Sequence, residues 1–525
     1  MDAVYQIRGL KIFSRFQVAE PLVHIPHLDL MRGQVIGMTG ESGAGKSLTA
    51  LSLLGLLRDG LEAVGEVGFC SADAPSEAVN VLREKTEDLV RIRRQKLGYI
   101  IQQPLLSFNP IKKLGHQIGE RLSHRTDLTS SEVKKEIISQ LSQLKILDPE
   151  RIYEAYPHQV SGGQLQRAAI AAALITQPEV IIADEATSSL DDETREEILG
   201  ELVRRCKKLS TTLILITHDL RAIEDHADHL LVMKSGQIVF NGNPLNKQEE
   251  SYTAGLFDLY KEYTAGAGTL FNEKDSVEAK SILPFHQSRG VQTRLEEAEL
   301  GYSVNRLWGK NTFQSVLTAV DAEFPASCRT GLYGESGSGK STLGKALCGL
   351  IPLNKGRLIF DNRVFNHGLS NPNFPQIQMV FQDPASSFNP VKKIRNQLRD
   401  AVALTSSDPK LIQTLMMHFG LEDSLLLRRP GQLSGGQIQR LAIVRALLHA
   451  PVGMVFDEFV TGLDIYWKVV VLQMVKQIAQ NSPMNLWVIS HEKAVIRHLC
   501  TSLFEVKNGQ LEERNGLVPT EDGFN

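Results

Sequence analysis

The stretch Gly40–Ser47 reads GESGAGKS, and a near copy, GESGSGKS, occupies Gly334–Ser341, 294 residues later. Both fit the pattern G-x-x-x-x-G-K-[ST], and each lies between a short apolar run and a helical pattern. In that setting the glycines let backbone N–H groups turn toward phosphate oxygens, the lysine reaches the outer phosphates, and the serine hydroxyl faces Mg²⁺. The repeat therefore predicts two nucleotide triphosphate sites in one chain.

The predicted phosphate-binding residues are the eight positions of each loop. In the first loop they are Gly40, Glu41, Ser42, Gly43, Ala44, Gly45, Lys46 and Ser47. In the second loop they are Gly334, Glu335, Ser336, Gly337, Ser338, Gly339, Lys340 and Ser341.

Other landmarks repeat in the same order, which indicates that one structural unit occurs twice. An SGGQ motif lies 23 residues before an acidic strand end, and a histidine follows the acid after 34 more residues, in both halves. The residues so spaced are Ser161, Asp184 and His218, and then Ser434, Asp457 and His491. The first half holds about fourteen extra residues around GFCSADAPSEAVN, a polar stretch that predicts a surface excursion.

An apolar run ends in two carboxylates in each half, as IIADE at 181–185 and MVFDE at 454–458. Alone, such a pattern is equally typical of a solvated acidic turn, but its position relative to the phosphate loop favours a catalytic role. We expect Asp184 and Asp457 to hold Mg²⁺ through water, and Glu185 and Glu458 to polarise an attacking water molecule.

Composition narrows the class of protein. The 525 residues carry 57 basic and 60 acidic side chains, so bulk electrostatics predict no nucleic acid partner. The five cysteines lack metal-ligand or disulfide spacing, which favours a reduced compartment. No apolar run approaches the ~20 residues of a spanning helix, so we expect the chain not to cross a membrane by itself.

The apolar runs before the phosphate loop, before Asp184 and before His218 are short and β-branched, and they do not alternate with polar residues. They predict buried strands in a mainly parallel sheet. Apolar positions from Val133 to Leu144 recur at helical spacing. The polar tract from about Lys247 to Thr293 predicts a linker. We therefore expect domains at 1–250 and 294–525, joined by residues 251–293.

With SGGQ placed at a helix start, the sequence resembles the nucleotide-binding domains of ABC transporters over nearly the whole chain outside the linker. The resemblance implies an α/β fold with two P-loop ABC ATPase domains in tandem. Each would hold a mainly parallel sheet core, an antiparallel β subdomain and a helical subdomain. The signature residues, which would touch ATP held by the other half, are Ser161, Gly162, Gly163, Gln164, Ser434, Gly435, Gly436 and Gln437.

The same resemblance implies roles for further side chains. Gln102 and Gln382 would contact Mg²⁺ or the attacking water, His218 and His491 would contact the γ-phosphate, and Asp191 and Asp464 would act across the paired halves. Candidates to stack on adenine are Phe13, Phe16 and Tyr302. Metal ligands would be Ser47, Gln102, Asp184, Ser341, Gln382 and Asp457. Both sites keep their catalytic residues, so we expect both to hydrolyse ATP.

The phrase SFNP after each glutamine, at 107–110 and 387–390, and SYTAGLFDL at 251–259 resemble the oligopeptide, dipeptide and nickel import ATPases. The resemblance implies two permease subunits, a periplasmic or surface solute-binding protein, and a peripheral place at the cytoplasmic face of the membrane. Peptide, nickel and metal chelate all stay open as substrates. The chain departs from the family at Val160, Gln103, Ala186 and Phe459, and it lacks the family's cysteine-rich tail.

Two alternatives come from other classes of protein. A ribosome-associated ATPase of the ABC-F kind also has two fused domains, but its connecting segment is long, helical and strongly basic, whereas residues 247–293 carry few basic side chains. A DNA-repair clamp would need a long coiled coil, and the sequence holds no sustained heptad pattern.

Overall fold

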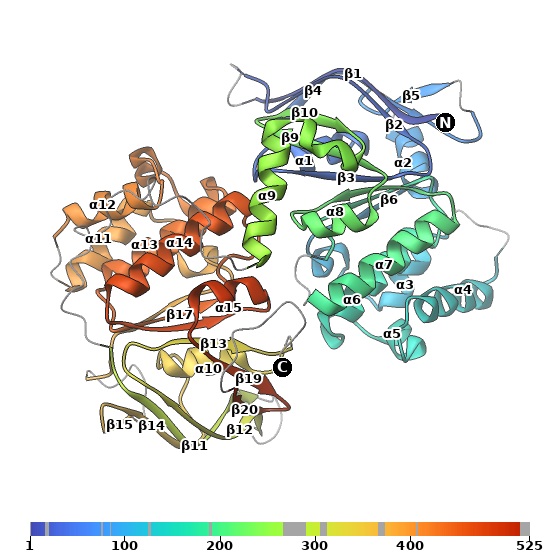
Figure 1. Cartoon of the computed structure of the whole chain (residues 1–525). Coiled ribbons are helices and arrows are strands. Elements are labelled where there is room, and N and C mark those ends of the chain that lie inside the picture. The colour runs from blue at the N-terminus through green and yellow to red at the C-terminus, as the bar shows by residue number, and fades with distance from the viewer. Residues whose placement is uncertain are drawn as a thin grey trace. The chain divides into compact units, whose positions relative to one another are not determined.

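The computed structural model describes residues 2–15, 20–74, 77–83, 86–123, 128–187, 192–265, 290–304, 312–335, 337–365, 373–405 and 408–514. The chain divides into two compact units, Met1–Asp258 and Leu259–Asn525 (Figure 1). Phe16, Asp191, Ser336 and residues 266–289 of the expected linker lie outside the described residues.

A six-stranded sheet forms the core of unit 1. Its order is β10-β9-β3-β8-β7-β6, with β10 antiparallel to β9 and the other neighbours parallel. All residues of β3, β7 and β8 are buried, as expected for strands covered on both faces. The predicted mainly parallel sheet is therefore confirmed. The strands are β3 (Val35–Gly40), β6 (Leu97–Ile100), β7 (Val180–Asp184), β8 (Thr212–Ile216), β9 (His229–Lys234) and β10 (Gln237–Gly242).

A second sheet of unit 1 is antiparallel, with the order β2-β1-β4-β5. Its strands are β1 (Ala3–Ser14), β2 (Val23–Met31), β4 (Leu61–Cys70) and β5 (Ala78–Asn80), and α1 (Lys46–Leu53) contributes to the same core. The surface excursion predicted around GFCSADAPSEAVN is partly wrong. Its two ends pair as strands, Phe69 with Val79 and Cys70 with Ala78, because the apolar Phe69 and Cys70 are buried. The helix α2 (Thr86–Gln95) follows.

The other helices of unit 1 pack with the large sheet around one core. They are α3 (Leu114–Glu120), α4 (Ser130–Gln143), α5 (Pro149–Glu154) and α6 (Gly162–Leu174), followed by α7 (Asp192–Lys208) and α8 (Leu220–His226). On α4 the predicted apolar face is buried at Ile137 and Leu141, and a capping box between Thr129 and Glu132 starts the helix.

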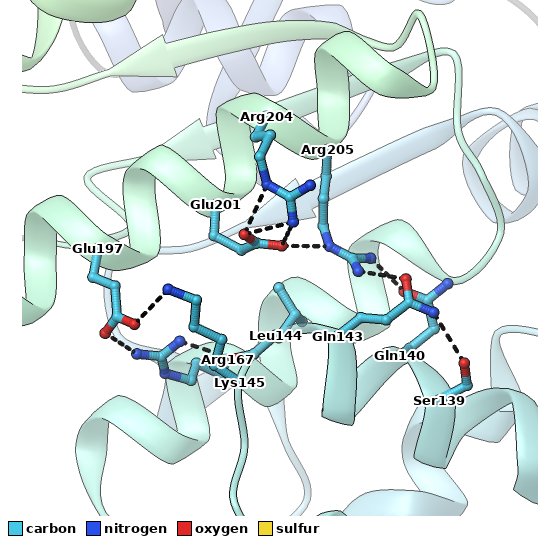
Figure 2. Close-up of polar contacts among 10 residues, drawn as sticks. All are labelled: Ser139, Gln140, Gln143, Leu144, Lys145, Arg167, Glu197, Glu201, Arg204 and Arg205. Carbon is cyan, nitrogen blue, oxygen red and sulfur yellow. Dashed lines mark hydrogen bonds and ion pairs between the residues drawn. The ribbon is translucent and has the colours of Figure 1, made fainter.

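Charged and amide side chains tie α7 to α4 (Figure 2). The buried Arg205 donates hydrogen bonds to Glu201 at 2.9 Å, to Gln140 at 2.9 Å and to Gln143 at 2.5 Å. Arg204 also donates to Glu201, at 2.6 Å. Glu201 and the buried Arg205 each have several partners, which is the condition under which a buried ion pair is tolerated.

Unit 2 repeats this architecture. Its large sheet has the order β16-β17-β18-β13-β19-β20, and its antiparallel sheet has the order β12-β11-β14-β15. The strands are β11 (Thr293–Val304), β12 (Thr312–Phe324), β13 (Arg329–Tyr333), β14 (Lys355–Phe360), β15 (Arg363–Phe365), β16 (Ile377–Val380), β17 (Gly453–Asp457), β18 (Asn485–Ile489), β19 (Ser502–Lys507) and β20 (Gln510–Glu513). The helices are α10 (Lys340–Leu347), α11 (Ile394–Thr405), α12 (Lys410–His418), α13 (Gly435–Leu448), α14 (Ile465–Asn481) and α15 (Lys493–Leu499).

The start of the expected linker is helical. After a 3-10 turn at Pro244–Glu249, α9 spans Ser251–Ala265, and the division between the two units falls inside it. On this helix Phe257 and Tyr263 are 1% and 3% exposed. The domain limits 1–250, 251–293 and 294–525 stay a prediction. Within the described ranges, no helix combines the length and apolarity that crossing a membrane requires.

Candidate ATP-binding and hydrolysis sites

The phosphate loop of unit 1 joins β3 to α1. Gly45, the residue before the helix, has φ 96°, and a Cβ atom there would lie 2.5 Å from a methyl group of Val23. Only glycine therefore fits this turn. Lys46 is buried, and its ammonium group donates to the carbonyl oxygens of Gly40 at 2.9 Å and Glu41 at 2.8 Å. The ammonium group of Lys46 therefore lies within the loop that the sequence predicts to bind phosphate.

The loop of unit 2 has the same geometry between β13 and α10. Gly339 has φ 111°, and Lys340 donates to the carbonyl oxygens of Gly334 at 2.6 Å and Glu335 at 2.8 Å. Both predicted loops thus form the same turn before a helix N-terminus, where N–H groups and the helix dipole favour an anion.

A hydroxyl and a carboxylate meet beside each loop. Ser47 Oγ lies 3.2 Å from an oxygen of Asp184, and Ser341 Oγ lies 2.9 Å from an oxygen of Asp457. Burial raises the pKa of Asp184, and it raises the pKa of Asp457 to about 6, because a buried carboxylate is costly to ionise. These oxygen donors suit Mg²⁺, and a bound cation would offset the cost of the buried charge.

The next residue carries the second carboxylate in an unusual backbone conformation. Glu185 and Glu458 both have φ 49°, in the left-handed region that side chains other than glycine rarely adopt. In each case the backbone N–H reaches across the sheet, to the carbonyl oxygen of Ile216 or Ile489, both at 2.9 Å. Strain of this kind clusters at functional sites. The bend turns each glutamate off the line of its strand.

The bent glutamate of unit 1 meets two other predicted residues. A carboxylate oxygen of Glu185 lies 2.9 Å from Nε2 of His218, and Gln102 donates to the other oxygen at 2.6 Å. The structure therefore brings together the expected base, switch histidine and glutamine of the first site.

In unit 2, His491 contacts Glu458 through both its ring and its backbone N–H. Nδ1 of His491 lies 2.7 Å from Glu458, and the backbone N–H of His491 donates to the same carboxylate at 3.1 Å. Gln382 is exposed just beyond the end of β16. The base and histidine of the second site are thus together, with a different set of hydrogen bonds from that of the first.

Each SGGQ motif starts a helix, as predicted. Ser161 caps α6 by accepting from the backbone N–H of Gln164 at 3.3 Å, and the side chain of Gln164 accepts from the N–H of Ser161 at 3.2 Å. Ser434 and Gln437 form the same capping box on α13. This arrangement fixes the two signature glycines in the first turn.

Asp464, Tyr302 and Phe13 were also predicted to act at the ATP sites. Asp464 is buried and caps α14 by accepting from the N–H of Trp467 at 3.0 Å. Tyr302 is 42% exposed, with its hydroxyl 3.1 Å from the Thr342 hydroxyl, while Phe13 is partly buried on β1. Their roles toward nucleotide stay predictions.

Two tyrosines at the first site were not predicted: Tyr99 lies in no motif, and the SYTAGLFDL segment that contains Tyr252 was not assigned to a nucleotide site. Tyr99, on β6, donates to Asp184 at 3.2 Å. Tyr252, on α9, donates to Glu41 of the phosphate loop at 3.0 Å, and the Lys234 ammonium lies 4.2 Å from the centre of its ring. Only the fold reveals that these residues reach the site.

Comparison with known proteins agrees with the geometry. The family model described as ABC transporter matches residues 23–188 and 317–461. The chain is 30% identical over 514 residues to the uncharacterized ABC transporter ATP-binding protein YejF of Escherichia coli K12, covering 96% of this chain and 93% of that protein.

Two further relatives carry more specific names. The peptidoglycan transport ATP-binding protein YejF of Agrobacterium fabrum is 30% identical over 505 residues, covering 92% of this chain and 87% of that protein. The glutathione import ATP-binding protein GsiA of Salmonella typhimurium is 29% identical over 509 residues, covering 93% and 82%. These names favour a transport ATPase over the ribosome-associated alternative. The chain belongs to the ABC transporter family, as an ATP-binding protein with two tandem ATPase domains.

Proposed function

We propose that this chain is the ATPase subunit of an importer for peptides or peptide-like solutes, with two working hydrolysis sites. The observation that carries the proposal is the glutamate–histidine contact that recurs in both units, between Glu185 and His218 and between Glu458 and His491. In both units the glutamate follows a buried aspartate that contacts the phosphate-loop serine.

In the proposed reaction, Glu185 and Glu458 orient and polarise the water that attacks the γ-phosphate. Lys46 and Lys340 hold the outer phosphates, and His218 and His491 fix the glutamates and face the γ-phosphate. Mg²⁺, bound by the serine and aspartate of each unit with Gln102 or Gln382 nearby, would neutralise phosphate charge. The remaining positions of both loops would bind phosphate through backbone N–H groups.

The pairing of the two halves is part of the proposal. Family resemblance favours an arrangement in which the signature at Ser434–Gln437 completes the site at Lys46, and the signature at Ser161–Gln164 completes the site at Lys340. Two phosphate loops and two capped signature helices in one chain support it. ATP would then close the halves, and hydrolysis would let them reopen.

Two permease chains and a solute-binding protein would complete the importer, with this chain peripheral at the cytoplasmic face of the membrane. The relatives named for glutathione import and peptidoglycan transport favour a substrate with peptide bonds. Nickel or a metal chelate is the second candidate, which rests only on the resemblance of SFNP and SYTAGLFDL to a group of import ATPases that includes nickel importers.

Reconstituted uptake tests the function. The chain, its two proposed permease subunits and the cognate binding protein would be placed in liposomes with ATP inside, and labelled glutathione, a tripeptide and Ni²⁺ would be offered outside. We expect ATP-dependent uptake of glutathione or the tripeptide, lost when Glu185→Gln and Glu458→Gln are combined. Uptake of Ni²⁺ alone would overturn the peptide assignment, and ATP turnover with no uptake of any solute would overturn the importer.

A further inference from the structure

The last turn of α9 is anchored beside the switch histidine of unit 2. The side chain of Tyr263 is 3% exposed, and its hydroxyl donates to a carboxylate oxygen of Glu492 at 2.7 Å. Glu492 directly follows His491, which contacts the expected base Glu458. A residue from outside the motifs therefore touches the loop that presents the switch histidine.

Several further contacts hold Glu492 and the end of α9 to α14 and α15. The ammonium group of Lys468 donates to both oxygens of Glu492 at 2.8 Å. The ring of Tyr263 stacks on His498, with ring centres 5.9 Å apart, and a ring nitrogen of His498 lies 3.0 Å from the carbonyl oxygen of Tyr263. Arg497 donates to the carbonyl oxygen of Thr264 at 3.2 Å. This density of contacts fixes the tyrosine hydroxyl in place.

The carboxylate of Glu492 is used differently from its counterpart in unit 1. Asp219, which follows His218, accepts from the backbone N–H groups of Arg221 and Ala222 and so caps α8. Glu492 occupies the same capping position before α15, but its side chain makes no capping hydrogen bond. Its carboxylate instead takes hydrogen bonds from Tyr263 and Lys468. The second switch loop is thus braced from α9 and α14.

We propose that Tyr263 is a positioning residue for the second ATP site: by holding Glu492, it fixes the loop 490–492 that presents His491 to Glu458. The proposal rests on the roles proposed above for His491 and Glu458. Tyr263 does not touch the reacting atoms. Its removal should slow hydrolysis at the second site and spare both nucleotide binding and the first site.

Site-resolved vanadate trapping tests this in the full chain. Protein is incubated with Mg²⁺, vanadate and photoreactive 8-azido-ATP, irradiated and digested, and the label is assigned to peptides of residues 1–258 or 259–525. We expect Tyr263→Phe, which removes only a hydroxyl, to lower trapped label in 259–525 at least about fivefold. Trapping in 1–258, and label bound on ice without vanadate, should stay within about twofold of the parent.

Matched variants separate positioning from general damage. Tyr260→Phe removes a hydroxyl one turn earlier on the same helix and should leave trapping at both sites unchanged. Glu492→Gln should lower trapping in 259–525, and adding Tyr263→Phe should then cost much less than it does alone, because the two residues act through one contact. Equal loss of label in both units, or full trapping in the Tyr263→Phe chain, would overturn the proposal. Failure of the proposed function is distinguishable, since the parent chain itself would then trap no label.

Discussion

A carboxylate oxygen of Glu458 lies 2.7 Å from Nδ1 of His491, and the backbone N–H of the same histidine donates to that carboxylate at 3.1 Å. The histidine thus holds the glutamate at two points. Since Glu458 is also turned out of its strand by a left-handed backbone, its carboxylate has a defined direction.

Replacement of the histidine should separate catalysis from binding. We expect His491→Ala to lower the turnover of the second site about 100-fold, since a misplaced general base loses most of its effect. The affinity for ATP should change less than about threefold, because Lys340 and the loop are intact. Phosphate release and equilibrium binding of a fluorescent ATP analogue check this. A loss of affinity equal to the loss of turnover would instead assign His491 to nucleotide binding.

Backbone strain at Glu185 predicts that a glycine variant unfolds less readily than an alanine variant, which is the reverse of the usual order. At φ 49° glycine is unstrained and alanine is not, so Glu185→Gly should be more stable than Glu185→Ala by about 1 kcal/mol. Both variants lack the carboxylate and should be equally inactive. Urea unfolding of the two variants measures the difference. If alanine proves the more stable, the left-handed conformation is wrong.

The hydrogen bonds among Glu201, Arg205 and Gln140 (Figure 2) allow a test of how side chains pack in unit 1. The positions of Glu201 and Arg205 on α7 correspond to Met474 and Ile478 on α14, since both helices have 17 residues and begin at the same distance from the acidic strand. Counted back four residues from the C-caps Leu144 and Phe419, the place of Gln140 on α4 corresponds to that of Leu415 on α12, which is fully buried. Unit 2 therefore carries apolar side chains at the three positions where unit 1 has Glu201, Arg205 and Gln140.

Removing one side chain of the polar network should lower the stability of unit 1 more than replacing all three side chains together. We expect Glu201→Ala to cost about 3 kcal/mol, because Arg205 stays buried without its carboxylate. The triple variant Glu201→Met, Arg205→Ile and Gln140→Leu, which copies unit 2, should recover most of that loss. Urea unfolding followed on unit 1 checks both, and a triple variant less stable than Glu201→Ala would refute the correspondence.

Arg445 anchors the SFNP segment of unit 2. Its guanidinium donates to the carbonyl oxygen of Ser387 at 2.6 Å and to its hydroxyl at 2.8 Å, and it lies 4.1 Å from the centre of the Phe388 ring. We expect Arg445→Ala to destabilise unit 2 by about 2 kcal/mol, since hydrogen bonds from a charged group are lost inside the protein. Arg399→Ala, at an exposed position of α11, is the control. A thermal scan in which both variants melt alike would contradict the anchoring role.

The partly buried Glu492 predicts a dependence of stability on pH. Burial alone would raise its pKa, but the charges of Lys468 and His491 and the hydrogen bonds from Lys468 and Tyr263 lower it to about 2. Because the folded pKa lies below the ordinary 4.5, the stabilisation is complete above pH 4.5 and is lost as the pH falls from there toward 2. The stability gap between the parent and Glu492→Gln should therefore narrow as pH falls from about 6 to about 3. A gap constant over that range would contradict the lowered pKa.

Sequence periodicity and motif spacing predicted the parallel sheets, both phosphate loops and the two capped signature helices, because each depends on local chemistry: glycine at left-handed turns, serine at helix starts and β-branched runs in buried strands. Contacts set by tertiary packing were not predictable in this way. Tyr99, Tyr252 and Tyr263 have no local pattern that assigns them to a site. The left-handed backbone of Glu185 was equally hidden, since nothing in IIADE distinguishes a bent glutamate from a straight one.

The most direct measurement of the central claim is phosphate release by the full chain with both glutamates changed. We expect the combined Glu185→Gln and Glu458→Gln variant to retain two bound ATP molecules per chain while releasing phosphate at least about 100 times more slowly than the parent. In each single variant, one of the two sites should keep its glutamate base. Phosphate release by the combined variant at the parental rate would show that these carboxylates are not the bases, and the account of both sites would be wrong.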